Sequence, residues 1–180
     1  MVPAHVTESI STPGAQPCDT PLADGTATVT PVVSVILDSN VWIDILVFDD
    51  PVSRPIRLAL EGGRLQALID RRCLAELAYV LDYPQFAKYA LDKAQTLQRL
   101  AALTRHVDPA PPADARPLPS CRDKDDQKFL ELAHASDAHW LVSKDRALLK
   151  LARRIERDFA FRIAIPAVFV AACGLAGESV

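Results

Sequence analysis

Short apolar runs alternate with longer amphipathic segments from residue 32 onward. The run VVSVIL at 32–37 is typical of a buried central strand, and further strands are predicted at 65–69, 140–142 and 161–165. Helices are predicted in the intervening segments, at 41–48, 53–61, 71–81, 88–104, 123–135, 146–157 and 167–173. Strands that alternate with helices predict an α/β fold, a three-layer α/β/α sandwich around a central parallel sheet.

Two segments fall outside this pattern. Residues 1–31 are rich in Pro, Thr, Ala and Ser without apolar periodicity, which predicts a disordered N-terminal extension. The folded domain is therefore expected to span residues 32–180. A second proline-rich stretch, at 108–119, is predicted to be a loop inside the domain or a flap beside its site.

Composition narrows the class of protein. With 49% hydrophobic residues the chain can bury a substantial core. Residues 1–31 hold three of the 23 acidic residues and none of the 20 basic ones, so the remainder carries 20 of each sign. A neutral domain is not marked as a nucleic-acid binder by charge, and such a role would need a local basic patch.

The same composition argues against several other classes. The four cysteines have no metal-site spacing, which favours buried thiols in a reducing compartment. No apolar stretch reaches the roughly 18 residues that a membrane span needs, and the start of the chain lacks a signal-peptide pattern. We therefore expect a soluble, cytoplasmic protein without membrane attachment.

Four acidic residues occupy positions where predicted strands end or helices begin. They are Asp38, Glu76, Asp126 and Asp145, and Asp123 lies three residues before Asp126. The functional crevice of an open parallel sheet lies outside the carboxyl ends of its strands, so these residues are expected to converge. Carboxylates that meet there repel one another, and a bound divalent cation is the usual relief.

Each acid also has a simpler explanation. Asp38 and Asp145 could cap the helices that follow them, and Glu76 could lie on a solvated helix face. Asp123 and Asp126 could complement a helix dipole. Asn40 and Ser143 stand close to two of the acids and are expected to orient a carboxylate or a metal-bound water. The prediction of a metal site rests on the joint pattern.

Four segments resemble a PIN domain. They are LDSNV at 37–41, LAEL at 74–77, CRDKDDQKFLELA at 121–133 and LVSKD at 141–145, and the resemblance spans roughly Val35 to Ala171. The third segment is the most specific and is similar to a subgroup of VapC-like toxins of type II toxin–antitoxin pairs. Ser39, Lys124 and Lys144 replace residues more common in that subgroup, but no acid is missing.

The resemblance implies a metal-dependent endoribonuclease. By position, Asp38, Glu76, Asp126 and Asp145 would be catalytic and would bind Mg²⁺ or Mn²⁺, with Asp123 as a possible further ligand. It also implies an RNA substrate, a small antitoxin that neutralises the protein, and a homodimer. A catalytically silent PIN-like module that binds protein or RNA stays open as the alternative.

RNA binding would need positive charge beside the acidic site. Residues 144–162 hold seven basic and three acidic residues, a surplus that could contact phosphates or simply form a solvated helix face. The candidates for RNA contact are Lys144, Arg146 and Lys150, together with Arg71 and Arg72 at a strand-to-helix junction.

Two other enzyme classes fit less well. Receiver domains use an acidic pair after the first strand, which the segment 34–40 lacks. Phosphatases of the haloacid-dehalogenase type use two Asp residues spaced by one residue, and Asn40 stands in the second of those positions. Both classes are therefore disfavoured.

Overall fold

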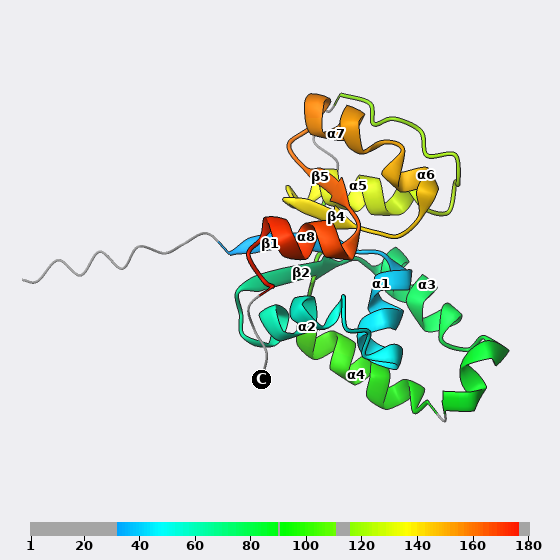
Figure 1. Cartoon of the computed structure of the whole chain (residues 1–180). Helices are drawn as coiled ribbons and strands as arrows, with labels where there is room; N and C mark the ends of the chain where they lie inside the picture. The colour runs from blue at the N-terminus through cyan, green and yellow to red at the C-terminus, as the bar shows by residue number, and fades with distance from the viewer. Residues whose placement is uncertain (1–31, 90, 111–115, 177–180) are drawn as a thin grey trace, which may run out of the picture. The chain divides into compact units, whose positions relative to one another are not determined.

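The computed structural model describes residues 32–89, 91–110 and 116–176. The extension predicted for residues 1–31 lies outside these residues. Five parallel strands form one sheet in the order β3-β2-β1-β4-β5 (Figure 1). The strands are β1 (Val33–Leu37), β2 (Leu65–Ile69), β3 (Thr104–His106), β4 (Trp140–Val142) and β5 (Arg162–Ala164). The first strand among the described residues, β1, is therefore the central one.

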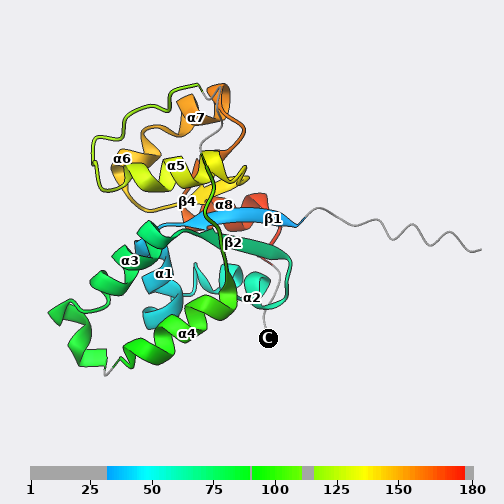
Figure 2. The ribbon, with the colours of Figure 1, turned by 180° about the vertical axis from the view of Figure 1, so that it is seen from behind.

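Helices cover both faces of the sheet. They are α1 (Ser39–Ile43), α2 (Arg54–Glu61), α3 (Arg71–Val80), α4 (Lys93–Leu103), α5 (Gln127–Ala135), α6 (Arg146–Leu149), α7 (Ala152–Asp158) and α8 (Pro166–Ala172). In both views α5, α6 and α7 lie on one side of the strands, and α1, α2 and α4 lie on the other (Figures 1 and 2). The predicted three-layer α/β/α sandwich is confirmed.

The core lies where these layers meet. In β1 the side chains of Val35, Ile36 and Leu37 are all buried, as expected of a strand with helices on both faces. The α5 residues Phe129 and Leu130 are also fully buried, and this helix packs against β1 and β4. The apolar face of α5 therefore fixes the position of the residues just before the helix.

Several boundaries differ from those that the sequence predicts. The first helix begins at Ser39 and passes into a π-helix, η1 (Asp44–Phe48). The segment 88–104 contains the end of a 3₁₀-helix, η2 (Pro84–Tyr89), then α4, and Thr104 already belongs to β3, an edge strand that was not predicted. The helix predicted at 146–157 is divided into α6 and α7.

The most consequential difference concerns the helix predicted at 123–135. It begins only at Gln127, so Asp123 lies in the preceding turn and not in the first helical turn. The described parts of the proline-rich stretch, 108–110 and 116–119, have no regular structure, and 111–115 lie outside the described residues. Within the described ranges, no helix is long and apolar enough to cross a membrane.

Candidate active site

Asp38 follows β1 at the point where the sheet order reverses between β1 and β4. Its backbone N–H donates to the carbonyl oxygen of Val142 at 3.0 Å, and its side chain is only 4% exposed. The Asn40 side chain donates to Asp38 Oδ2 at 2.6 Å, and the Ser143 hydroxyl donates to the same oxygen. Burial raises the pKa of Asp38; the hydrogen bond from Ser143 opposes that rise, and the charge of Glu76 adds to it.

Glu76 reaches the same region from α3. The Ser39 hydroxyl donates to Glu76 Oε1 at 2.8 Å, and the ammonium group of Lys128 forms an ion pair with Oε2. Ser39 directly follows Asp38, so the start of α1 joins these two acids. Lys128 comes from α5, which packs against α3. Glu76 is therefore held from two elements.

Asp126 immediately precedes α5 and does not use its side chain to cap the helix. No described residue donates a hydrogen bond to its carboxylate. Burial raises the pKa of Asp126 to about 7, and the charges of neighbouring acids add to the rise, in the order Asp38, Asp145, Asp123 and Glu76. The acids that the sequence singles out thus lie within electrostatic range of one another.

Asp145 has two roles at once. It caps α6, because its Oδ1 accepts from the N–H groups of Ala147 at 2.6 Å and Leu148 at 3.3 Å. Its charge nevertheless contributes to the raised pKa of Asp126. The Ser143 hydroxyl links both halves of the site, since it donates to Asp38 and accepts from the N–H of Asp145 at 2.9 Å. Asp145 can therefore cap α6 and belong to the acidic cluster at the same time.

The oxygen donors of this cluster fit a hard divalent cation. Asp38, Asp126, Asp145 and Glu76 are the residues that would hold it, and the like-charge repulsion on Asp126 is the kind that a cation relieves. Among the described residues, no three acidic, His or Cys side chains already surround one point as ligands. One oxygen of Asp145 accepts from an amide of α6, and Glu76 is paired with Lys128.

Asp123 makes a hydrogen bond within its own turn. Its Oδ1 accepts from the N–H of Asp125 at 3.0 Å, within the same turn. It acts on Asp126 as a nearby charge. Its part as a further metal ligand stays a prediction.

The basic candidates fall into two groups. Arg71, Arg146 and Lys150 are exposed, and none has an ion-pair partner among the described residues. Lys144 instead pairs with the buried Asp44, at 2.6 and 2.8 Å to its two oxygens. Arg72 also has ion-pair partners. Only Arg71, Arg146 and Lys150 therefore have charges that are available for RNA contact.

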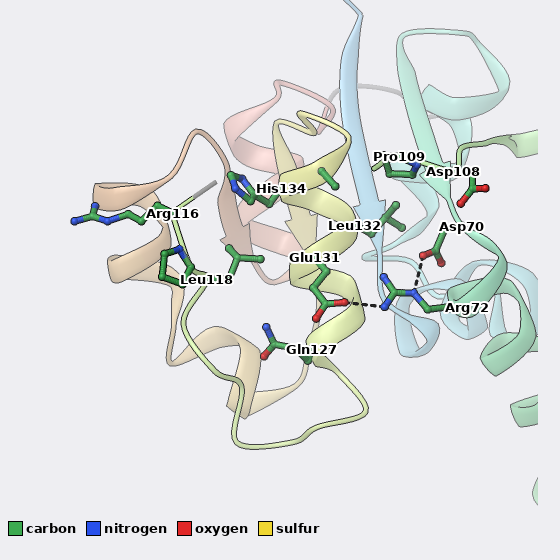
Figure 3. A pocket seen from close by; sticks show the side chains of 12 residues that line it. Asp70, Arg72, Asp108, Pro109, Arg116, Leu118, Gln127, Glu131, Leu132 and His134 are labelled. Atoms are coloured by element: carbon green, nitrogen blue, oxygen red, sulfur yellow. Dashed lines mark hydrogen bonds and ion pairs between the residues drawn. The ribbon is translucent and has the colours of Figure 1, made fainter. Parts of the chain in front are cut away.

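Arg72 lies in a separate pocket of about 660 Å³ beside α5. Figure 3 shows its guanidinium between Asp70 and Glu131, with distances of 3.1 and 2.7 Å to their carboxylate oxygens. Gln127 and His134 line the same pocket, but none of the four clustered acids does. The pocket is therefore distinct from the acidic site.

Three residues of the site escaped the sequence analysis. Ser39 and Lys128 contact Glu76 directly, and Asp44 holds Lys144 beside Asn40. Ser39 could have been found from its place next to Asp38. Lys128 and Asp44 carry no such signal, because one lies in a charged helix turn and the other in an apolar run.

A parallel sheet between helical layers, with acids gathered at its carboxyl edge, defines a PIN-like α/β/α protein. A family model described as PIN domain matches residues 34–147. This match covers more than half of the chain and includes all four acids, and the chain belongs to the PIN domain family. PIN domains are generally metal-dependent nucleases. No curated protein and no solved structure matches the chain.

Proposed function

We propose that this protein is a metal-dependent endoribonuclease that hydrolyses RNA phosphodiester bonds with Mg²⁺ or Mn²⁺. The observation that carries the proposal is the gathering of the four acids at one edge of the sheet: Ser143 links Asp38 to the backbone of Asp145, Ser39 holds Glu76 beside Asp38, and burial together with the neighbouring charges raises the pKa of Asp126 to about 7. A structural carboxylate would normally be given a hydrogen-bond donor or a basic partner. A carboxylate left under such repulsion is suited to a cation.

The chain's own residues would divide the work. Asp38 is fixed by Asn40 and Ser143, which leaves its other oxygen for a ligand. Asp126 and Asp145 approach from α5 and α6, and Glu76 would bind a second ion or orient a water molecule. A bound ion would supply Lewis acidity and lower the pKa of its water toward neutrality. Arg146, Lys150 and Arg71 would contact RNA phosphates.

The test compares cleavage of a mixed RNA pool with Mg²⁺ or Mn²⁺, with and without EDTA. Asp38→Asn and Asp126→Asn should each lower the rate by roughly 100-fold or more, as expected when preorganised charge is lost from an active site. Asp92→Asn is the matched control, because Asp92 caps α4 through the N–H of Gln95. Cutting that survives EDTA or both site variants would refute the proposal.

One observation favours a second candidate, a PIN-like module that binds RNA or protein without cutting. The Glu76–Lys128 ion pair and the capping role of Asp145 leave no ready set of three ligands among the described residues. This candidate predicts RNA binding without cleavage under every metal condition. The cleavage assay therefore separates the two.

We propose further that the protein is the toxin of a toxin–antitoxin pair and forms a homodimer. Support for the toxin role comes from the resemblance of residues 121–133. For the dimer, support comes from an apolar groove of about 440 Å³ between α3 and α4, which includes Leu74, Ala78 and Leu97. Expression of the protein should arrest growth until the neighbouring gene is co-expressed. Ala78→Arg should shift the sedimenting species from dimer to monomer.

A further inference from the structure

Lys128 is the one basic residue of the described chain that is ion-paired with an acid of the site. It lies two residues after Asp126, and its ammonium reaches from α5 to Glu76 on α3. The Lys128 side chain is 15% exposed and that of Glu76 is 26% exposed, so the pair is largely shielded from solvent. A shielded charge pair is stronger than an exposed one.

The Lys128 ammonium has two further contacts. The nitrogen also donates to the backbone carbonyl of Asp125 and lies 5.1 Å from the centre of the Phe129 ring. The other three acids of the site have no basic partner in the described part of the chain. Lys128 is thus a single positive charge paired with one member of an acidic group.

We propose that Lys128 is an internal counter-ion that competes with a divalent cation for Glu76. This inference rests on the proposed metal-dependent function. Without an ion, the ammonium offsets part of the repulsion among the acids and stabilises the fold. With an ion, the Oε2 atom of Glu76 must exchange the ammonium for the metal. Lys128 therefore weakens metal binding. It also makes the metal-free protein more stable than it would be without this charge.

An ordinary structural salt bridge predicts something different. Its loss would lower stability to the same extent with or without metal and would leave metal affinity unchanged. Competition instead couples the two properties, because the same carboxylate is shared by both cations. The coupling must also vanish when Glu76 no longer carries a charge.

The experiment measures Mn²⁺ binding by electron paramagnetic resonance, without RNA, in the full-length protein. Lys128→Met should tighten Mn²⁺ binding roughly tenfold, the size expected for removing one close positive charge. Lys128→Arg keeps the charge and should bind like the wild type. Lys124→Met is the matched control, because Lys124 lies in the same segment, is exposed, and its ammonium bonds only to Ser120 among the described residues.

Two further measurements keep the inference falsifiable. In a Glu76→Gln background, Lys128→Met should no longer change Mn²⁺ affinity. The melting temperature of Lys128→Met should be lower than that of the wild type in EDTA, and saturating Mn²⁺ should narrow this deficit. Should Lys128→Met fail to fold, Lys128→Gln replaces it in every arm.

The outcomes separate this inference from the proposed function. Wild-type protein that binds Mn²⁺ and cuts RNA, with unchanged or weaker Mn²⁺ binding in Lys128→Met, overturns the counter-ion role alone. Wild-type protein that neither binds Mn²⁺ nor cuts RNA overturns both. Tighter binding in Lys128→Met that depends on Glu76 supports the inference even where no RNA substrate has been found.

Discussion

At the scale of single residues, the protonation of Asp126 has a direct effect on stability. Its pKa in the folded protein is raised from 3.8 to about 7. The folded state therefore holds this proton more tightly than the unfolded chain does. The resulting stability is fully present below about pH 4 and is lost as the pH rises through about 7.

We predict that Asp126→Asn stabilises the metal-free protein at pH 8. The amide cannot ionise, so the repulsion from Asp38 and Asp145 no longer acts on this position. The melting temperature in EDTA should rise by about 2–4 °C at pH 8. This rise corresponds to a gain of about 1 kcal/mol in the free energy of unfolding for a domain of this size. The gain should be much smaller at pH 5, and an equal gain at both pH values would contradict the assignment.

At the scale of elements, the end of β4 and the start of α6 combine capping with site chemistry. We predict that Asp145→Ala lowers the free energy of unfolding by about 1 kcal/mol, since two amides lose their acceptor. Asp145→Asn should retain most of the stability, because Asn is as good a cap, yet lose Mn²⁺ affinity. Urea unfolding and Mn²⁺ titration of both variants test this prediction. Equal Mn²⁺ affinity in Asp145→Asn and in the wild type would show that Asp145 is not a metal ligand.

The elements also show what the sequence can and cannot predict. The buried strands at 65–69 and 140–142 are confirmed residue for residue, because their apolar runs are bounded by turns. The strand β3 was missed, since Thr104-Arg105-His106 has no apolar residue and is held by pairing with β2. The start of α5 was wrong because acidic residues suit a helical first turn and the preceding turn equally well.

The same contrast holds within the site. Asp38 and Asp145 could be singled out because they come after predicted strands, and Asp126 because it lies near a predicted helix start. Glu76 lies within a helix and could be singled out only from the joint pattern. Their electrostatic coupling follows from the parallel sheet. The contacts of Lys128 and Lys144 were not, because both depend on which acid lies opposite after folding. The local sequence pattern does not indicate which distant residue a flexible side chain will contact.

At the scale of the whole molecule, the balanced charge of residues 32–180 means that RNA would be held by few contacts. We predict that Arg146→Ala combined with Lys150→Ala lowers the slope of log affinity against log salt by about 1.4, or 0.7 for each lost phosphate contact to single strands. The measurement uses RNA binding by the Asp126→Asn protein at several KCl concentrations. Arg99→Ala, on the exposed side of α4, is the control and should leave the slope unchanged.

The central position of β1 has a consequence for the order of events during synthesis. Asp38 is made early, but its backbone amide and its carboxylate are both held by residues of the segment 142–143. A growing chain that has not reached this segment has neither the neighbouring strand nor the hydroxyl that fix the acid. The centre therefore cannot assemble before residues 142–143 have been made. Synthesis of the first acid alone is therefore not enough for any activity to begin.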